Sequence, residues 1–237
     1  MMPSSFSEMK AVILAAGKGT RMLPLTKSVP KPLLEVAGRP FLSWLLDRLK
    51  QAGITEYVIV IGHLGEKITS FIQKQGIQAS FVVQEEQKGT GHALLQCRNY
   101  IHEDFLMVGA DNLWNAKDLK NLSQSPDWAL LGKEVEDPSN YGVLKTKDGI
   151  LQDIFEKPKE FVGNLINTGA YKFTPEVFSL LQDLKPSPRG EIELTDAIKH
   201  YSRSKKVHVL LAEQWLDLGK PQDIKRIENI LRECVEL

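Results

Sequence analysis

The sequence predicts an α/β protein with a mixed, mostly parallel β-sheet flanked by helices. Short apolar runs alternate along the chain with segments whose apolar residues recur at helical spacing. Strand–helix–strand units of this kind form right-handed crossovers, which place helices on both faces of a sheet. The 237 residues contain no internal repeat and no long Pro/Gly/Ser linker, so we expect a single domain with two lobes.

The first half of the chain alternates most regularly. Its predicted elements are strand 10–17, helix 40–53, strand 56–63, helix 65–76, strand 79–84, helix 91–101 and strand 104–111. The helix over 40–53 has Leu42, Leu45 and Leu49 on one face and ends at Gly53. The strand segments on either side of it, KAVILAAG and EYVIVIGH, are apolar almost throughout, which is typical of strands buried on both faces.

The second half is more mixed. Its predicted elements are strands over 127–135, 141–158, 167–173 and 207–212, and helices over 175–184, 192–203 and 221–237. The segment over 141–158 contains Asp148 and Gly149, a pair that favours a tight hairpin turn. The last helix has Ile224, Ile227 and Leu231 on its apolar face.

The composition argues against several classes of protein. The 30 Lys and Arg residues balance the 30 Asp and Glu residues, and a net charge of zero argues against a general nucleic-acid binder. The sequence has neither a run of about 18 apolar residues nor the apolar core of a signal peptide. We therefore expect a cytoplasmic protein with no membrane partner. Cys97 and Cys234 lie far apart without metal-ligand spacing, so we expect both to be reduced.

A glycine-containing loop follows the first strand in the stretch VILAAGKGTRMLPLTKSVPKPLL. Small residues at Gly17 and Gly19 let the backbone approach an anion, and successive N–H groups can surround a phosphate. Two well-known phosphate loops fit poorly. Lys18 is misplaced for the ATPase loop, and Met22 stands where the dinucleotide fingerprint has its third glycine. The glycines alone leave a phosphate site and an unoccupied turn equally open.

The residues after these glycines carry a resemblance to a known family. The segments TRM (20–22), PLT (24–26) and PKPLL (30–34) resemble the signature of the sugar-1-phosphate nucleotidylyltransferases, and the similarity extends along nearly the whole chain. The resemblance implies a Rossmann-like sheet of the nucleotide-diphospho-sugar transferase fold. It also implies a nucleotide-binding lobe over about 9–112, a sugar-phosphate-binding lobe over about 113–220 and a C-terminal helix over 221–237.

The nucleotide side follows from the same resemblance. Arg21 is a permanent cation whose forked donors suit phosphate oxygens, and Lys31 is held between two prolines. The segment 84–94 resembles the base-binding part of uridylyl- and thymidylyltransferases, in which Gln84 would read a uracil or thymine edge. We expect His92 to start a helix without contacting a ligand. The implied nucleotide-binding residues are Ala15, Ala16, Gly17, Gly19, Thr20, Gln84, Gly89 and Thr90.

Two carboxylates form the implied metal site. Asp111 ends a strand and matches the aspartate that binds Mg²⁺ in the family, although Ala110 replaces the usual preceding glycine, which we expect to shift nearby contacts. Asp217, in WLDLG (215–219), matches the second acidic ligand. The segment ADNLW lacks the second aspartate of the Asp-x-Asp pattern, which argues against a glycosyltransferase of related architecture.

The sugar side is implied by the segments YGVL, FEKP and NTGAY. By resemblance, Gly142 presents backbone to the sugar, Glu156 and Asn167 bind hydroxyls with Thr168 beside them, and Lys157 binds the sugar phosphate. The segment GEIELTD also matches the family, and we expect Glu191 and Asp196 to support this lobe.

The implied reaction transfers a nucleoside monophosphate from UTP or dTTP to a sugar-1-phosphate, with Mg²⁺ as cofactor and Arg21, Lys31 and Lys157 as catalytic residues. Two alternatives stay open. One is a cytidylyltransferase acting on phosphocholine, which needs an aromatic cage from residues such as Trp114, Trp128, Trp215 or Tyr141. The other is a non-catalytic regulatory subunit. The chain shows no hexapeptide repeats of an acyltransferase region, so we expect nucleotidyl transfer only; the sequence leaves the nucleotide, the sugar and any homo-oligomer open.

Overall fold

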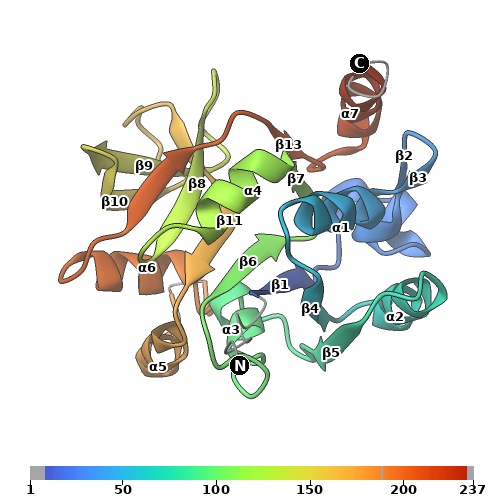
Figure 1. Ribbon diagram of the computed structural model, residues 1–237. Helices are drawn as coiled ribbons and strands as arrows, with labels where there is room; N and C mark the ends of the chain where they lie inside the picture. The colour runs from blue at the N-terminus through green and yellow to red at the C-terminus, as the bar shows by residue number, and fades with distance from the viewer. Residues whose placement is uncertain (1–8, 188, 234–237) are drawn as a thin grey trace, which may run out of the picture.

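The computed structural model describes residues 9–187 and 189–233. Its main feature is a nine-stranded sheet of described residues, which runs through both halves of the chain (Figure 1). In spatial order the strands are β5 (Ala79–Val83), β4 (Glu56–Ile61), β1 (Lys10–Ala15), β6 (Phe105–Gly109), β11 (Leu165–Phe173), β8 (Ala129–Glu134), β12 (His208–Leu211), β10 (Ile150–Glu156) and β9 (Gly142–Lys147). The predicted mixed sheet flanked by helices is confirmed.

Strand direction changes at the centre of this sheet. β5, β4, β1 and β6 pair in parallel, as the strand–helix alternation predicts. β11 then pairs antiparallel with both β6 and β8, while β12 is parallel to β8. The β9–β10 hairpin turns at Asp148 and Gly149, whose φ angles of 51° and 73° are those of a tight primed turn, so this predicted hairpin is confirmed.

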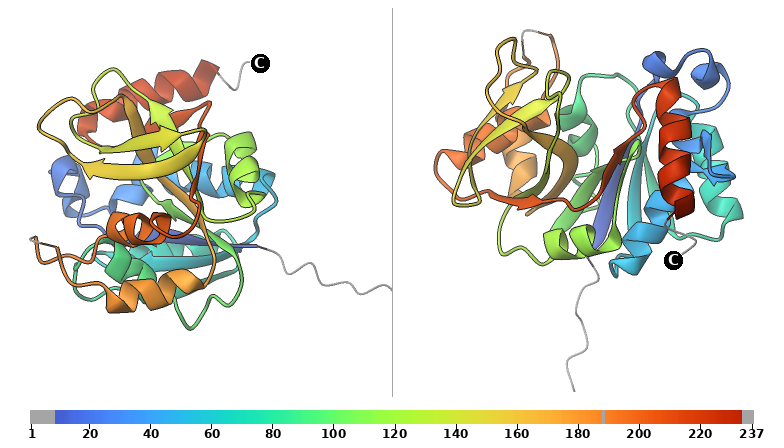
Figure 2. Two further views of the ribbon diagram at one scale, coloured as in Figure 1. Left: turned by 90° about the vertical axis from the view of Figure 1, so that its left-hand side faces the viewer. Right: turned by 90° about the horizontal axis from the view of Figure 1, so that it is seen from above.

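Helices cover both faces of the sheet, as Figures 1 and 2 show. They are α1 (Phe41–Gln51), α2 (Gly65–Lys74), α3 (Thr90–Leu95), α4 (Ala116–Ser123), α5 (Glu176–Asp183), α6 (Leu194–Ser202) and α7 (Pro221–Glu233). One buried cluster joins α1, α2, α4 and α7 to the face of β1 that carries Ala11 and Ile13. A second cluster joins α3, α5 and α6 to the opposite face, which carries Val12. Both faces of β1 are therefore buried, which explains its continuous apolar run.

Several short elements were not predicted. They are the 3₁₀ turns η1 (Thr20–Met22), η2 (Leu25–Lys27) and η3 (Lys31–Leu33), the ladder of β2 (Glu35–Val36) with β3 (Arg39–Pro40), the ladder of β7 (Asn112–Trp114) with β13 (Trp215–Asp217), and α4. The helix predicted over 91–101 was too long, because α3 ends at Leu95 and turns follow.

The ends of the chain and its cysteines complete the comparison. α7 packs beside β2, where the Glu228 carboxylate accepts the Ala37 N–H at 3.1 Å. Cys97 is a buried free thiol, and burial raises its pKa to about 12. Residues 234–237, with Cys234, lie outside the described residues. No helix among the described residues is long and apolar enough to cross a membrane.

α4 is tied to the segment that leads into β13. Asp118 is only 3% exposed, and its Oδ2 accepts the N–H groups of Glu213 at 2.9 Å and Gln214 at 3.2 Å. Burial raises the pKa of this carboxyl, while the two backbone N–H groups oppose the rise. Through this contact α4 holds the backbone of residues 213–214, which directly precede β13 and Asp217.

Replacing Asp118 by alanine removes the acceptor for both N–H groups. We expect Asp118→Ala to lower the free energy of unfolding by about 1–3 kcal/mol. Asp118→Asn keeps an acceptor oxygen and should cost less. Urea denaturation at pH 7 measures both variants; an alanine variant as stable as the asparagine variant would contradict this role.

Candidate active site

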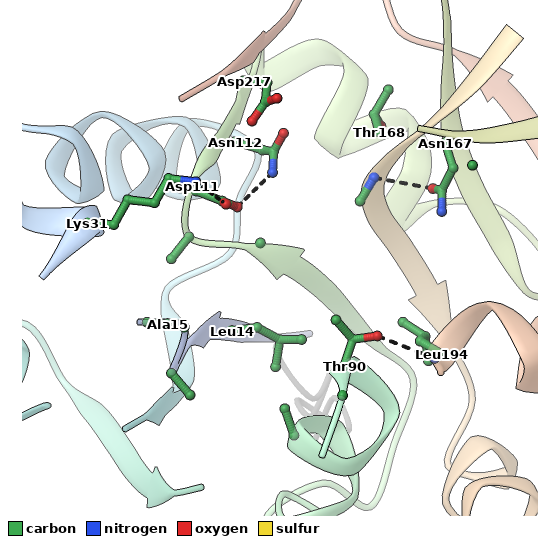
Figure 3. A pocket seen from close by; sticks show the side chains of 18 of the residues that line it. Leu14, Ala15, Lys31, Thr90, Asp111, Asn112, Asn167, Thr168, Leu194 and Asp217 are labelled. Carbon is green, nitrogen blue, oxygen red and sulfur yellow. Dashed lines mark hydrogen bonds and ion pairs between the residues drawn. The ribbon is translucent and has the colours of Figure 1, made fainter. Parts of the chain in front are cut away.

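A cavity of about 580 Å³ lies beyond the carboxyl ends of β1 and β6, between the two halves of the sheet (Figure 3). This is where ligands bind in open α/β sheets, at the point where the order of the strands reverses, here between β1 and β6. All the candidate site residues line it: Ala15, Ala16, Gly17, Gly19, Thr20, Arg21, Lys31, Gln84, Gly89, Thr90, Asp111, Gly142, Glu156, Lys157, Asn167, Thr168 and Asp217. Glu191 also lines the cavity, whereas Asp196, Lys18 and His92 are not among its described lining residues.

The glycine loop is shaped by the residues that follow it. Gly19 has φ 63°, and a Cβ there would lie 2.9 Å from Thr26 Cγ2 and 3.2 Å from Lys31 Cβ. The Thr26 hydroxyl donates to the Gly19 carbonyl at 2.8 Å. η1 then carries Arg21 exposed at the rim of the cavity. The PLT and PKP parts of the sequence pattern therefore fix the backbone of the loop.

Lys31 and Asp111 form an ion pair inside the cavity. The Lys31 side chain is 9% exposed, and its ammonium lies 2.6 Å from Asp111 Oδ2 (Figure 3). Asp111 Oδ1 accepts from Asn112 Nδ2 at 2.8 Å, and Asn112 Oδ1 accepts from Trp215 Nε1 at 2.8 Å. Ala110 is 1% exposed and belongs to the core cluster around α1 and α4, so packing accommodates its methyl group.

Asp217 lies beside this group because β7 and β13 pair in a register that aligns it with Asn112. Tyr141 donates its hydroxyl to Asp217 Oδ2 at 3.2 Å. Burial raises the pKa of the Asp217 carboxyl above its ordinary value, and the neighbouring Asp111 carboxylate adds to the shift, while Lys31 opposes it. The charged form of Asp217 is thus disfavoured by burial and by repulsion from Asp111. A hard divalent cation bound to oxygens of both carboxylates would offset this cost.

On the side of the cavity next to the end of β5, Gln84 is 6% exposed. Its Nε2 donates to the Gly89 carbonyl at 3.2 Å and lies 3.1 Å from His92 Nδ1. Gly89 has φ 96°, and a Cβ there would come within 2.6 Å of the Ile192 carbonyl. The Thr90 hydroxyl accepts the Leu194 N–H at 3.3 Å (Figure 3), so this segment is joined to the start of α6.

On the opposite side, Asn167 donates to the Tyr171 hydroxyl at 2.6 Å. Its side-chain oxygen accepts the Gly169 N–H at 3.2 Å, the dashed line drawn at Asn167 in Figure 3. Thr168 is 2% exposed; its hydroxyl accepts from Trp114 Nε1 at 3.0 Å and donates to the Leu131 carbonyl at 2.7 Å. Thr168 thus connects the cavity wall to the core.

The lining of the cavity also includes Glu156, Lys157, Glu191 and Glu193. Burial raises the pKa of the Glu193 carboxyl, and the neighbouring Glu191 and Glu156 carboxylates raise it further, against the Arg189 guanidinium. Lys157 has φ 44° and donates its N–H to the Tyr141 carbonyl at 3.1 Å, and its exposed ammonium lies 4.0 Å from the Glu156 carboxylate.

Comparison with known proteins identifies the family. A family model described as nucleotidyl transferase matches residues 10–233. The chain belongs to this nucleotidyl transferase family. The prediction made from the loop signature is therefore confirmed.

Individual relatives agree with this nucleotidyl transferase assignment. The chain is 39% identical over 236 residues to the UTP–glucose-1-phosphate uridylyltransferase AglF of Haloferax volcanii, covering 95% of this chain and 97% of that protein. It also resembles the bifunctional protein GlmU of Methanococcus maripaludis at 38% identity, covering 93% of this chain. The chain spans about half of GlmU, 54% of its length.

Solved structures give the same result for the fold. UDP-glucose pyrophosphorylase complexed with UDP-glucose matches with a TM-score of 0.83 and 26% identity, covering 95% of this chain and 99% of that one. A Bacillus anthracis protein described as a glucose-1-phosphate thymidylyltransferase matches with a TM-score of 0.85 and 29% identity, covering 94% and 95%.

Sequence reasoning missed several residues of the nucleotidyl transferase cavity. Asn112 and Trp215 orient Asp111, Tyr141 contacts Asp217, and Gln87 donates to the Ala16 carbonyl at 2.6 Å. Asn112 follows Asp111 directly, and Trp215 lies two residues before Asp217. Their adjacency was the available signal, but the β7–β13 ladder that brings them together has no signature in a single sequence.

The raised pKa of Asp217 predicts a cost to stability when no cation is bound. A carboxyl whose pKa is higher in the folded state stabilises that state at low pH, and this stability is lost as pH rises above the ordinary value of 3.8. We expect Asp217→Asn to raise the melting temperature of the cation-free protein at pH 7 by roughly 2–4 °C, which corresponds to about 1 kcal/mol.

Thermal unfolding in chelator at pH 7 and pH 4 measures this effect, which should shrink at the lower pH. Asp137→Asn is the matched control, because hydrogen bonds from Ser139 lower the pKa of Asp137 and its removal should give no gain. If Asp217→Asn melts at or below the temperature of the unmodified protein at pH 7, then burial and repulsion by Asp111 do not make the charged Asp217 carboxylate destabilising.

Proposed function

We propose that the chain transfers a nucleoside monophosphate from UTP or dTTP to a sugar-1-phosphate, releasing pyrophosphate. One observation carries the proposal: a single cavity is lined on one side by the glycine loop, Arg21 and Gln84, and on the other by Glu156, Lys157 and Asn167. Asp111 and Asp217 lie between them. The cavity thus has cations for two phosphate groups, an amide for a base and oxygen acceptors for sugar hydroxyls.

Two observations support UTP or dTTP as the nucleotide substrate. The Haloferax relative is named as a UTP-dependent uridylyltransferase, and the Bacillus neighbour as a thymidylyltransferase. The amide of Gln84 suits the imide edge that uracil and thymine share. Because these substrates are cytoplasmic metabolites, we place the proposed activity in the cytoplasm.

The chemistry is an in-line displacement at the α-phosphorus. A phosphate oxygen of the sugar-1-phosphate forms the new P–O bond, and the bond from the α-phosphorus to the oxygen bridging the β-phosphate breaks, so pyrophosphate leaves with the electron pair. The nucleophile is already ionised at neutral pH, so no general base is required. The protein must instead position two anions and offset their repulsion.

The residues have distinct parts in this scheme. Lys157 holds the phosphate of the sugar substrate, and Arg21 stabilises charge on the α-phosphate and the leaving group. Asp111 and Asp217 would hold Mg²⁺, which when bound supplies positive charge to the triphosphate oxygens. Among the described residues no group of three or more His, Cys, Asp or Glu could hold a metal alone, so the remaining ligands would come from phosphate and water. Lys31, already on Asp111, adds a further cation.

A phosphocholine cytidylyltransferase is a weaker alternative. A quaternary ammonium needs exposed aromatic faces. Trp114 and Trp128 are fully buried in the core, which removes two of the four cage candidates. Tyr141 and Trp215 do line the cavity, but they are hydrogen-bonded to Asp217 and Asn112 respectively.

Pyrophosphate release with Mg²⁺ tests the proposal over a grid of substrates. The nucleotides are UTP, dTTP, CTP, ATP and GTP, and the acceptors are glucose-1-phosphate, N-acetylglucosamine-1-phosphate and phosphocholine. We expect release from UTP or dTTP with a sugar-1-phosphate. Release only from CTP with phosphocholine, or none from any pair, would overturn the proposal.

The roles of the phosphate cations can be tested against neighbouring lysines. We expect Arg21→Ala to lower kcat by roughly 100-fold or more, since it removes a donor to charge that develops during the reaction. Lys18→Ala is the matched control, because Lys18 is exposed and is not among the described lining residues. If Arg21→Ala and Lys18→Ala lower kcat equally, Arg21 does not have the proposed role in stabilising charge on the phosphates.

Lys157 has a similar control two residues away. Lys157→Met should raise the KM for the sugar-1-phosphate and lower kcat by roughly 100-fold, while Lys159→Met leaves both near their original values. Steady-state kinetics with the sugar-1-phosphate varied at saturating nucleotide separates the two constants. A Lys157→Met enzyme with an unchanged KM and kcat would exclude this lysine from the phosphate site.

A further inference from the structure

The amide of Gln84 has a single orientation that its surroundings allow. The Gly89 carbonyl, 3.2 Å from Nε2, can only accept a hydrogen bond, so the amide nitrogen must face it. The same nitrogen lies 3.1 Å from His92 Nδ1. Both N–H groups of the amide are thereby used within the protein. The carbonyl oxygen Oε1 is the part of this buried side chain left to meet a ligand in the cavity.

His92 completes this arrangement from outside the cavity. It is the third residue of α3 and is partly buried. To accept from Gln84 its Nδ1 must be unprotonated, so the proton of the neutral ring lies on Nε2. That nitrogen is 3.3 Å from Gln96 Nε2, which also donates to the His92 backbone carbonyl at 3.1 Å. The Gln96 amide can accept the ring proton only by turning about its last torsion and giving up that backbone hydrogen bond. The ring is thus held between Gln84 on one side and Gln96 on the other.

We infer that His92 is a positioning residue that sets the choice of pyrimidine base by fixing the Gln84 amide. The inference rests on the proposed function, since it concerns the base of the same nucleotide. Uracil and thymine carry an N–H at ring position 3, which Gln84 Oε1 can accept. Cytosine carries a lone pair at that position, so it meets Oε1 with no hydrogen between two acceptors. Loss of His92 frees one amide N–H and lowers the cost of turning the amide toward cytosine.

Nucleotide selectivity of three variants tests this role. His92→Leu keeps much of the volume but removes the acceptor, and we expect the UTP-to-CTP ratio of kcat/KM to fall by roughly three- to tenfold, the value of one hydrogen bond. His92→Asn places an amide oxygen near the position of Nδ1 and should restore the ratio. Gln96→Leu, which removes the contacts of Gln96 with ring Nε2 and with the His92 carbonyl but keeps Nδ1, should change it less than His92→Leu does.

Binding provides a readout that does not depend on turnover. Calorimetric titration of UTP and CTP, without sugar phosphate, should show the affinity ratio falling in His92→Leu and recovering in His92→Asn. Melting temperatures check that each variant is folded. If the unmodified protein releases no pyrophosphate, the proposed function fails, while this titration still tests His92. A ratio unchanged in His92→Leu, or lowered equally in His92→Asn, would overturn the inference.

Discussion

The arrangement of the cavity depends on keeping two carboxylates side by side. Asp111 and Asp217 come from distant parts of the chain and repel each other, and burial adds to the cost for Asp217. The short β7–β13 ladder holds them in register, and the Lys31 ammonium offsets part of their charge. Asn112 and Trp215 then fix the direction of Asp111. A site built this way retains an electrostatic cost in the folded state, which a cation between the two carboxylates would relieve.

The sheet explains why the other groups meet at this point. β1 and β6 are parallel, so the glycine loop after β1 and Asp111 after β6 leave the same edge. β11 runs antiparallel beside β6, which brings Asn167 and Thr168 to that edge from the opposite direction. The glycine loop, Asp111 and the first residues of β11 therefore meet at one edge of the sheet, although they lie far apart in the sequence.

Much of this could be predicted from the sequence, and the reasons differ by residue. The strands of the first half are continuous apolar runs, and the loop signature specifies many residue types over a short stretch. Both can be recognised from neighbouring residues alone, so the sequence predicts them. α4 was missed because it has only eight residues, with Leu119 and Leu122 as its buried apolar side chains. Asn115, whose side chain accepts the Asp118 N–H at 2.7 Å, was the local signal for its start.

Other features have no local signal at all. Thr168 lines the cavity, and its hydroxyl bonds Trp114 and Leu131, which only the folded chain reveals. The pairing of Asn112 with Trp215, and of Tyr141 with Asp217, joins segments far apart in sequence. Such contacts depend on which distant segments meet in the folded chain, and β7 and β13, with three residues each, are too short to carry a pattern that predicts their pairing.

The pairing of β6 with β11 determines how wide the cavity is between β1 and β11. Because hydrogen bonds join these strands directly, both walls belong to one sheet and cannot rotate apart as separate rigid bodies. The separation of the walls is then set by strand spacing, about 4.8 Å per strand or on the order of 10 Å from β1 to β11. A ligand that reached from the side of β1 to the side of β11 would therefore have to fit a span that the strand pairing fixes.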